Sequence, residues 1–409
     1  MLYFLYPQLR KLSGAERLIL RLAAHTVELD AAVTLVTHFV DDTCRPALDL
    51  RVNLIETGRR ARLFRNHYFD APLEYLYSVN LLGRVGRDAS ALIFFGPPSL
   101  PALYWSKHVE RRARPHLYFC YEPPRFIYDD AREITARLGM AGAVAGPAFS
   151  IYKIVDRTFT RSADVLLANS LFGAERLHAA YRRDATVITH GVDLARPTPA
   201  QIESLRMRYH LAGRSVLLTV NFLHPRKRID LFLRTLQLVR AGVPNAAGLV
   251  VGAGPEAVRL HTLAHELQLD DAVIFTGFVP DQELPAYYAL ADLYLHTGKL
   301  ESFGLSVLEA SAAGVPVIAV NEGGPREIVA DGESGRLVAA DPEALAAAAG
   351  ALLRDDARRI EMGAAGQRRV TEHYSWSRGA QTLLQVVQAA MTREHSEAAR
   401  RREGDAVGQ

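Results

Sequence analysis

The sequence contains little cysteine and no long apolar run. Cys44 and Cys120 are the only cysteines among 409 residues, and they show neither the spacing of a metal site nor that of a disulfide framework. A reducing, cytoplasmic setting therefore fits best. No stretch of about 18 or more apolar residues occurs, so we expect no membrane-spanning helix. Residues 1–6 are apolar but short and run into Pro7 without a basic leader, which predicts a first strand rather than a signal peptide.

A strong overall charge is also absent. The chain carries 48 basic and 45 acidic residues, a formal net charge of only +3, so no global field draws it to nucleic acid. The sequence has no Asp-x-Asp spacing and no His or Cys cluster with ligand spacing. We therefore expect neither a divalent metal nor another resident cofactor.

The composition and the hydrophobic pattern predict an α/β protein with two domains. With 49% hydrophobic and 23% charged residues, the chain is typical of a globular protein, and 409 residues are too many for one ordinary core. Short apolar runs alternate with longer helical patterns, as in parallel sheets with crossover helices. We expect strands at residues 2–6, 33–37, 92–95, 117–120, 165–168, 186–188, 216–220, 249–251, 273–275, 293–296 and 317–320.

The boundary between the domains is predicted near a segment that contains glycine and proline. Residues 191–199 have the composition of a connection, so we expect an N-terminal domain over residues 1–192 and a C-terminal domain over residues 193–375. Residues 376–392 have the pattern of an amphipathic helix that packs back on the first domain. The polar residues 393–409 are expected to form a flexible tail.

The strongest functional signal is the segment from Glu301 to Pro316. Two glutamates, Glu301 and Glu309, lie eight positions apart, with Gly304 in a loop and a helix expected from about residue 305. Glu309 is surrounded in sequence by leucine and alanine, where an unpaired carboxylate would be costly, so it should meet a partner such as a sugar or ribose hydroxyl. A bland alternative stays open: Glu309 faces solvent on a short surface helix or caps a neighbouring turn.

Free backbone N–H groups at the start of that helix could bind an anion. The positive end of the helix dipole would lie just after Gly304. A second candidate for anion binding is the basic triplet Arg226-Lys227-Arg228, which follows an expected strand. Its alternative interpretation is a solvated charge run, the usual fate of basic triplets.

Several motifs in a fixed order resemble glycosyltransferase family 4 over nearly the whole chain. The paired glutamates match the family's most distinctive motif. The other matching segments lie at residues 13–17, 168–170, 187–193, 225–231, 252–256, 276–280 and 322–325. The resemblance implies two facing Rossmann-like domains with a deep interdomain cleft and a retaining transfer of a hexose from a nucleotide diphosphate sugar.

The resemblance also implies roles for individual residues. Glu309 would bind the donor ribose, Glu301 would lie beside the donor sugar, and Lys227 would neutralise the diphosphate leaving group. A fixed cation and helix N-terminal amides should lower the barrier, because negative charge develops on that leaving group. The remaining donor-binding residues that the resemblance implies are Gly14, Arg226, Arg228, Phe278, Val279, Phe303, Gly304 and Leu305.

The chain departs from the family pattern at two positions. Phe222 stands where an arginine usually precedes the lysine by five positions, and Arg226 or Arg228 would have to replace that charge. Tyr121 stands where many relatives carry a histidine near the acceptor, and a tyrosine is a poor proton acceptor at neutral pH. The adjacent Glu122 could orient the acceptor instead. We therefore count Tyr121 and Glu122 among the catalytic candidates.

Other functions stay open on the sequence alone. Residues 252–257 match a dinucleotide-binding fingerprint, but the acidic residue expected after the next strand is missing. Glu301 and Glu309 could be the carboxylate pair of a glycoside hydrolase, although both lie on one loop–helix unit. A nucleotide-sugar isomerase of the same architecture and an inactive nucleotide-sugar-binding module are further alternatives.

The sequence says least about the identity of the acceptor. Relatives with the Pro-Pro-Arg and Arg-Lys-Arg features are often mannosyltransferases, which favours GDP-mannose as donor and a glycan or lipid-linked acceptor. Peripheral contact with the cytoplasmic membrane face is an open expectation that rests on two basic runs; the alternative is that both are solvated helix faces. The runs are Arg59, Arg60, Arg62 and Arg65, and Lys107, Arg111, Arg112 and Arg114.

Overall fold

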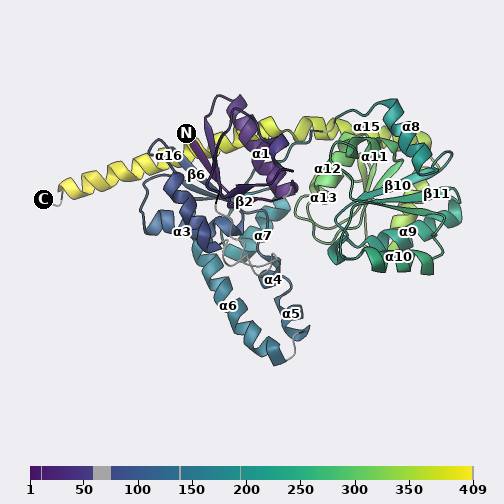
Figure 1. Cartoon of the computed structure of the whole chain (residues 1–409), viewed down its shortest axis with the longest axis horizontal. Helices are drawn as coiled ribbons and strands as arrows, with labels where there is room; N and C mark the ends of the chain where they lie inside the picture. Colours follow the sequence, from purple (N-terminus) through teal and green to yellow (C-terminus); the bar gives the residue numbers. More distant parts are fainter. Residues whose placement is uncertain (11, 59–74, 138–139, 194, 408–409) are drawn as a thin grey trace. The chain divides into compact units, whose positions relative to one another are not determined.

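The computed structural model describes residues 1–10, 12–58, 75–137, 140–193 and 195–407. The first basic run, from Arg59 to Arg65, lies outside the described residues. The chain forms two compact units: unit 1 comprises Met1–His190 and Trp376–Gln409, and unit 2 comprises Gly191–Ser375. Each unit is an α/β domain built on a parallel sheet (Figure 1).

Unit 1 contains a seven-stranded parallel sheet in the order β5-β3-β1-β6-β7-β8-β9. The strands are β1 (Leu2–Leu5), β3 (Val33–Thr37), β5 (Asn53–Glu56), β6 (Ala91–Phe95), β7 (His116–Phe119), β8 (Val165–Ala168) and β9 (Ala185–Val187), and a separate pair is β2 (Gln8–Leu9) with β4 (Phe39–Val40). The α-helices are α1 (Gly14–Glu28), α3 (Leu100–His108), α4 (Arg125–Tyr128), α5 (Ala131–Arg137), α6 (Met140–Arg161), α7 (Leu171–Tyr181) and α16 (Trp376–Val407). Short 3-10 helices are η1 (Arg45–Ala47), η2 (Ser78–Arg84) and η3 (Pro97–Ser99).

Side chains from both faces of this sheet are buried. Alternate residues of β1 belong to different cores: Leu2 and Phe4 pack with α1 and α16, whereas Tyr3 and Leu5 pack with η2, α3 and α7. This alternation follows from the two-residue period of a strand. It explains why the strands are hydrophobic throughout, as expected for a parallel sheet covered on both faces.

Unit 2 contains a six-stranded parallel sheet in the order β12-β11-β10-β13-β14-β15. The strands are β10 (Ser215–Val220), β11 (Ala246–Val251), β12 (Val273–Gly277), β13 (Leu293–His296), β14 (Val317–Val320) and β15 (Gly335–Val338). The helices are α8 (Pro199–Arg208), η4 (Pro225–Lys227), α9 (Ile229–Gly242), α10 (Ala257–Glu266), α11 (Leu284–Leu290), α12 (Leu305–Ala312), α13 (Pro325–Ile328), α14 (Pro342–Leu353) and α15 (Asp356–His373).

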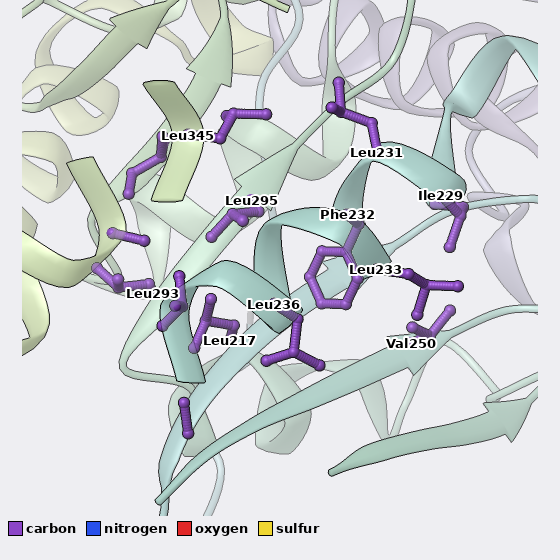
Figure 2. Close-up of a cluster of buried hydrophobic side chains, with 14 of the residues drawn as sticks. Leu217, Ile229, Leu231, Phe232, Leu233, Leu236, Val250, Leu293, Leu295 and Leu345 are labelled. Atoms are coloured by element: carbon purple, nitrogen blue, oxygen red, sulfur yellow. The ribbon is translucent and has the colours of Figure 1, made fainter. Parts of the chain in front are cut away.

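The core of unit 2 lies on the two faces of its sheet. Figure 2 shows one face, where Phe232 and Leu236 of α9 pack on Leu217 of β10 and Leu293 of β13. On the other face, α8, α11 and α12 pack against Leu218 and neighbouring strand residues. The helices therefore fix the sheet between two apolar layers, and its strand ends hold the connecting loops in place.

All the strands that the sequence predicted are present in the structure. Their ends differ from the predicted ends by at most three residues. The sequence analysis missed β5 and β15, which are only partly buried and form no continuous apolar run, and also β2 and β4, which are only two residues long. It also ended the last helix too early. α16 continues to Val407, past the predicted end at residue 392 and through the expected flexible tail, because the charged residues there are good helix formers without a proline.

Both cysteines are buried and unbridged. Cys44 and Cys120 are free thiols with no exposed surface. Burial raises the pKa of the Cys44 thiol to about 11 and raises that of Cys120 further. Neither thiol therefore ionises at neutral pH.

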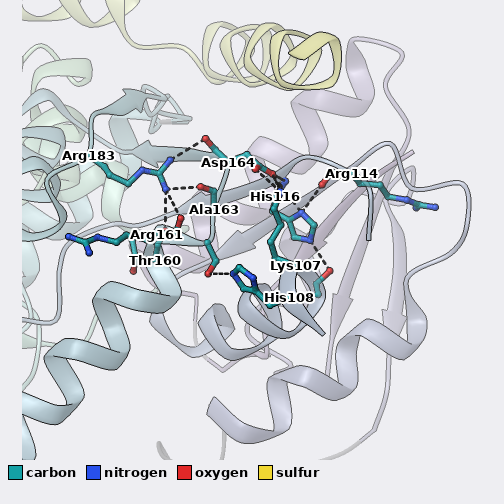
Figure 3. A network of polar contacts seen from close by, with 11 residues as sticks. Lys107, His108, Arg114, His116, Thr160, Arg161, Ala163, Asp164 and Arg183 are labelled. Carbon is teal, nitrogen blue, oxygen red and sulfur yellow. Dashed lines mark hydrogen bonds and ion pairs between the residues drawn. The ribbon is translucent and has the colours of Figure 1, made fainter. Parts of the chain in front are cut away.

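A partly buried polar network ties β7 and β8 together at their amino-terminal ends (Figure 3). Asp164 accepts hydrogen bonds from the Lys107 ammonium at 2.7 and 2.9 Å and from the backbone N–H of His116 at 2.8 Å. The His116 imidazole lies 2.8 Å from Ser106 Oγ and 2.6 Å from the carbonyl oxygen of Arg114. Ser106 and His116 are fully buried, so this Ser–His–Asp arrangement is structural and offers no nucleophile to a substrate.

Asp164→Asn tests the stabilising role of this network. Burial alone would raise the pKa of the Asp164 carboxyl, but hydrogen bonds with His116 and Lys107 hold that pKa at about 2. We expect the substitution to cost about 1 kcal/mol at pH 7, which would lower the melting temperature by about 2–4 °C. A carboxyl with a lowered pKa stabilises the fold above its unfolded pKa, so the difference from wild type should shrink as pH falls from about 4 towards 2.

The matched control for this prediction is Asp184→Asn, because the Asp184 side chain is 96% exposed. Calorimetry at several pH values should show little change for the control. An Asp164→Asn variant that melts like wild type at pH 7 would contradict the stabilising role.

Candidate functional site

The residues implicated by the sequence in donor binding lie mostly on loops at one edge of the unit 2 sheet. In a parallel sheet all strands end at the same edge, and ligands bind where neighbouring strands wind in opposite directions. Here that switch lies between β10 and β13, because the chain proceeds from β10 to β11 and β12 on one side and from β13 to β14 and β15 on the other. The loops after these two strands carry Lys227 and Glu301.

An ion pair joins these two loops. The Lys227 ammonium donates a hydrogen bond to Oε2 of Glu301, and both side chains are about one quarter exposed, at 23% and 27%. Two hydrogen bonds to backbone carbonyls hold the loops together: the Thr297 hydroxyl donates to the Lys227 carbonyl at 2.8 Å, and the Lys299 N–H donates to the Arg226 carbonyl at 2.7 Å. A cation and a carboxylate thus meet in a fixed place above the switch point.

A second ion pair supports the basic triplet from the other side. Arg228 donates to both carboxylate oxygens of Glu322, at 3.1 and 3.2 Å. The backbone of Arg228 has φ of 47°, in the left-handed region, which costs a non-glycine residue about 1 kcal/mol. The two-pronged ion pair offsets that cost and fixes the Arg228 guanidinium against Glu322.

Two glycines allow the β14 loop to pass directly beneath Glu301. A Cβ on Gly323 would lie 2.4 Å from the Glu301 carbonyl oxygen, and one on Gly324 would lie 2.5 Å from Cα of Phe303. The Gly324 N–H donates to the Glu301 carbonyl at 2.7 Å. Any larger side chain at either position would displace the loop that positions the Glu301 carboxylate.

Helix α12 begins at Leu305, as the sequence predicted, with Gly304 at its N-cap. Gly304 has φ of 102°, a conformation that favours glycine, and no side chain caps the helix. The first backbone N–H groups of the helix are therefore available at this edge of the sheet. The Phe303 side chain is buried in the core against Tyr374, so only its backbone can serve a ligand.

Glu309 is a buried carboxylate on the next turn of α12, with 7% of its surface exposed. Tyr288 of α11 donates a hydrogen bond from its hydroxyl to Oε2 of Glu309 at 2.7 Å. The prediction that this carboxylate needs a partner is thus met by a residue that the sequence analysis missed. In the sequence, Tyr288 is only a tyrosine on the helix before α12. Hydrophobic periodicity does not distinguish such a residue from an ordinary core residue.

His296, at the end of β13, is a further residue that the sequence analysis missed. The imidazole is fully buried, and neither ring nitrogen has a hydrogen-bond partner among the described residues. It lies under the Glu301 loop, where a Cβ on Gly298 would come within 3.0 Å of its Nε2. Burial lowers the pKa of His296 to about 4, with Glu301 acting to raise that pKa and Lys227 to lower it, so the ring is neutral at pH 7.

The glycines of the dinucleotide-like fingerprint contact protein backbone. A Cβ on Gly252 would lie 1.8 Å from the carbonyl oxygen of Asn221, and one on Gly254 would lie 2.3 Å from that of Leu223. The close approach that these glycines permit is thus used by the β10 loop. This packing removes the main support for a dinucleotide site at this strand end.

The remaining donor-binding candidates of unit 2 differ in exposure. Phe278, after β12, is 62% exposed, whereas the neighbouring Val279 is buried in the core. Arg226 is exposed, and its guanidinium makes no ion pair with any described residue. Phe278 and Arg226 can therefore offer side chains to a ligand, and Val279 can offer only its backbone.

The candidates of unit 1 gather at the switch point of its own sheet, between β1 and β6. The Tyr121 side chain is partly buried beside Gly96 at the end of β6, and its buried hydroxyl has no hydrogen-bond partner among the described residues. Burial, with Tyr6 and Glu16 nearby, raises the pKa of Tyr121 well above its usual value, so it stays protonated. Tyr121 can therefore donate a hydrogen bond but cannot act as a base at neutral pH.

Glu122 and Gly14 show more ordinary surroundings. The Glu122 carboxylate is paired with the Arg125 guanidinium: Arg125 Nε lies 2.7 Å and Arg125 Nη2 lies 2.6 Å from Glu122 Oε2. Gly14 is the first residue of α1, and a Cβ there would meet nothing within 4 Å. The protein alone thus gives no steric reason for a glycine at this position.

The second basic run is largely engaged within the protein. Lys107 pairs with Asp164, Arg112 donates to the Leu82 carbonyl at 2.9 Å, and Arg114 donates to the Gly86 carbonyl at 3.0 Å. These bonds account for most of the run without a membrane. Over the described ranges, no group of three or more His, Cys, Asp or Glu side chains is placed to hold a metal ion. In the same part of the chain, no helix is long and apolar enough to cross a bilayer.

Two family models match the chain in succession. Residues 12–196 match the family described as Glycosyltransferase Family 4, and residues 204–369 match Glycosyl transferases group 1. The two matches meet near the boundary between the units. Both agree with the family that the ordered sequence motifs resemble.

Curated relatives match somewhat more than half of the chain. It is 36% identical over 237 residues to the GDP-mannose-dependent alpha-(1-6)-phosphatidylinositol monomannoside mannosyltransferase of Mycolicibacterium smegmatis, covering 55% of this chain and 62% of that protein. It is 38% identical over 253 residues to the D-inositol 3-phosphate glycosyltransferase of Salinispora tropica, covering 57% of this chain and 52% of that protein. The match thus spans less than two thirds of either relative.

Solved structures match nearly the whole chain. Anabaena Alr3699/HepE, in complex with UDP and glucose, has a TM-score of 0.73 at 21% identity, covering 95% of this chain and 99% of that one. Sucrose-phosphate synthase from Thermosynechococcus elongatus has a TM-score of 0.74 at 19% identity, covering 96% and 99%. At these identities the likeness establishes the fold.

The buried His296 makes stability depend on pH in a way that His296→Leu should remove. Its pKa is lowered from 6.5 to about 4 in the fold, so between these values the unfolded chain binds a proton that the native protein does not. Wild-type stability should therefore fall as pH drops from 6.5 to 4, with this residue contributing about 2 kcal/mol of the change. In His296→Leu, the decline over that range should be shallower by a similar amount.

The measurement is the melting temperature across pH 7 to 4. His265→Leu is the control, because the His265 side chain is 80% exposed. Equal pH slopes for His296→Leu and wild type would show that His296 is not held neutral by burial.

Proposed function

The chain belongs to glycosyltransferase family 4, and from this membership we propose that it is a retaining hexosyltransferase. It transfers a hexose from a nucleotide diphosphate sugar to a hydroxyl of a glycan or lipid-linked acceptor. The observation that carries the proposal is the ion pair between Lys227 and Glu301, which stands over the switch point of the unit 2 sheet. An enzyme of this kind needs a fixed cation for the diphosphate and a carboxylate beside the sugar at one place.

The donor occupies the carboxyl edge of the unit 2 sheet. Its diphosphate replaces Glu301 as the partner of the Lys227 ammonium and receives hydrogen bonds from the first N–H groups of α12, after Gly304. The Glu301 carboxylate accepts hydrogen bonds from the hexose hydroxyls. The buried carboxylate of Glu309 accepts hydrogen bonds from the ribose hydroxyls, and Phe278 and Val279 meet the base.

The transfer breaks the bond between the anomeric carbon and the β-phosphate oxygen. The acceptor oxygen forms the new bond to that carbon on the same face, and its proton passes to the departing phosphate. Lys227 and the helix N-terminus stabilise the charge that develops on this phosphate, which is the largest electrostatic demand of the reaction. Tyr121, as a protonated hydroxyl, and Glu122 orient the acceptor and take no proton from it.

The donor is GDP-mannose, and the acceptor carries a sugar or an inositol ring. Two matched relatives support this choice, because one is named as GDP-mannose-dependent and acts on a phosphatidylinositol mannoside, and the other is named for inositol 3-phosphate. Peripheral contact with the cytoplasmic membrane face would bring the enzyme to a lipid-linked acceptor. A nucleotide-sugar isomerase or an inactive binding module are the alternatives, and release of nucleotide only in the presence of an acceptor would distinguish a transferase from both.

The reaction is metal-independent in this proposal. Support comes from the absence of Asp-x-Asp in the sequence and from Lys227, which supplies a cation where a metal would otherwise be needed. Activity should therefore survive treatment with EDTA.

Lys227→Ala tests the leaving-group role. Removing the cation should lower kcat about 100- to 1,000-fold, since an electrostatic contact to a developing charge is lost. Lys227→Arg should retain part of the activity. Arg259→Ala, which removes a 53% exposed cation on α10, is the control. Full activity of Lys227→Ala with GDP-mannose would contradict the proposed role of Lys227 in stabilising the leaving group.

Glu309→Gln tests the ribose contact. A buried carboxylate gives stronger hydrogen bonds than an amide, so the affinity for the nucleotide sugar should fall about tenfold with little change in the fold. Thermal shift with a panel of nucleotide sugars identifies the donor first, and isothermal titration then compares the variant with Glu361→Gln, whose side chain is 66% exposed. Proton NMR of the product reports the anomeric configuration, and an inverted product would rule out the retaining mode.

A further inference from the structure

We propose that Phe222 is a specificity-determining residue whose ring stacks on the C–H face of a six-membered polyol ring, a pyranose or a cyclitol, in the donor or the acceptor. The inference rests on the proposed function. It starts from the position of Phe222 in the loop after β10, five residues before Lys227, where the family usually carries an arginine. The structure shows how this loop is held and what its side chain presents.

The backbone on both sides of Phe222 is fixed by neighbouring strands. The Asn221 N–H donates to the Val251 carbonyl at 2.9 Å, and the Leu223 N–H donates to the Ala253 carbonyl at 3.0 Å. Asn221 and Leu223 are buried. Phe222 is thus the one residue of this tripeptide whose side chain is directed to solvent.

Two glycines make this clamp possible. Gly252 and Gly254 let the β11 loop approach the carbonyl groups of Asn221 and Leu223 more closely than any side chain would allow. The glycine pattern that resembles a dinucleotide fingerprint therefore serves to hold Phe222 in place. A ring whose backbone is already ordered loses little further conformational entropy when a ligand stacks on it.

Phe222 is also unusually exposed for a large aromatic residue. Its side chain is 60% exposed, and within the described part of unit 2 the other strongly exposed aromatic ring is that of Phe278, after β12. Single exposed apolar residues are common on surfaces. Here, however, both exposed rings lie on loops at the carboxyl edge of the sheet, which is the edge that carries Lys227 and Glu301.

The positive charge of the family arginine is not restored in its place. Arg228 is bound to Glu322 by both of its terminal nitrogens, at 3.1 and 3.2 Å. The Arg226 side chain is exposed but leaves from the next turn, η4, rather than from position 222. An apolar ring therefore stands at position 222, where the family pattern has a cation.

His224 extends this surface. Its ring stacks with that of Phe222, with centroids 6.4 Å apart and an interplanar angle of 21°. His224 Nδ1 accepts a hydrogen bond from the Arg226 N–H at 3.3 Å, which leaves Nε2 as the ring nitrogen that can donate to a ligand. An exposed aromatic face beside a hydrogen-bond donor suits the apolar face and the hydroxyl rim of a sugar or inositol ring.

A substitution series at position 222 tests the proposal with GDP, GDP-mannose and a phosphatidylinositol mannoside in mixed micelles as probes. Phe222→Trp keeps a ring, Phe222→Ala removes it, and Phe222→Arg restores the family residue. Ile360→Ala, at a 70% exposed apolar position of α15, is the control for loss of an exposed apolar side chain. Circular dichroism and melting temperature establish that each variant is folded.

Stacking on the donor hexose predicts that Phe222→Ala and Phe222→Arg bind GDP-mannose about tenfold more weakly while binding GDP as wild type does. Stacking on the acceptor predicts unchanged binding of both nucleotides and a KM for the acceptor raised about tenfold. In either case Phe222→Trp stays within about threefold of wild type.

The inference is overturned if Phe222→Ala changes neither quantity, or if Phe222→Arg matches or exceeds wild type in kcat/KM. The latter result would show that position 222 serves the diphosphate as in the relatives. A wild-type chain that binds no nucleotide sugar would instead refute the proposed function and, with it, this inference, whereas loss confined to the Phe222 variants leaves the function standing.

Discussion

The contact between the Lys227 ammonium and the Glu301 carboxylate organises the candidate site. It joins the loops that follow β10 and β13, the two central strands of the unit 2 sheet, and hydrogen bonds from the Thr297 hydroxyl and the Lys299 N–H also hold those loops together. Each partner balances the charge of the other, so neither is an isolated ion at a partly buried position. A ligand with a diphosphate and several hydroxyl groups can satisfy both partners at once when it separates them.

The glycines around this pair explain how the loops come so close. Gly323 and Gly324 pass under Glu301 and Phe303, and Gly252 and Gly254 pass beside Asn221 and Leu223. In each place the space that a side chain would fill is taken by another backbone segment. The same residue type can therefore indicate ligand contact in a sequence motif and yet serve contact within the protein.

The sequence predicted the strand positions well, because buried parallel strands form continuous apolar runs that need no tertiary information. It also predicted the start of α12 at Leu305, since Gly304 and the following apolar pattern are local signals. It could not predict that Tyr288 bonds to Glu309 or that Arg228 bonds to Glu322, because these contacts depend on how separate helices and loops meet. The predicted end of α16 was wrong for another reason. The charged composition of the last residues was interpreted as a flexible tail, although these residues are good helix formers and the helix continues to Val407.

Because both natural thiols are buried, the native protein should not react with thiol-modifying reagents. Maleimides and iodoacetamides react with accessible thiolates, and neither Cys44 nor Cys120 offers one at neutral pH. A cysteine introduced at one solvent-facing position would then be the sole target of such a reagent in the native protein. With one such cysteine introduced in each unit, a pair of spin labels or fluorophores could be attached without first removing the natural cysteines, and the separation of the units in solution could be measured directly.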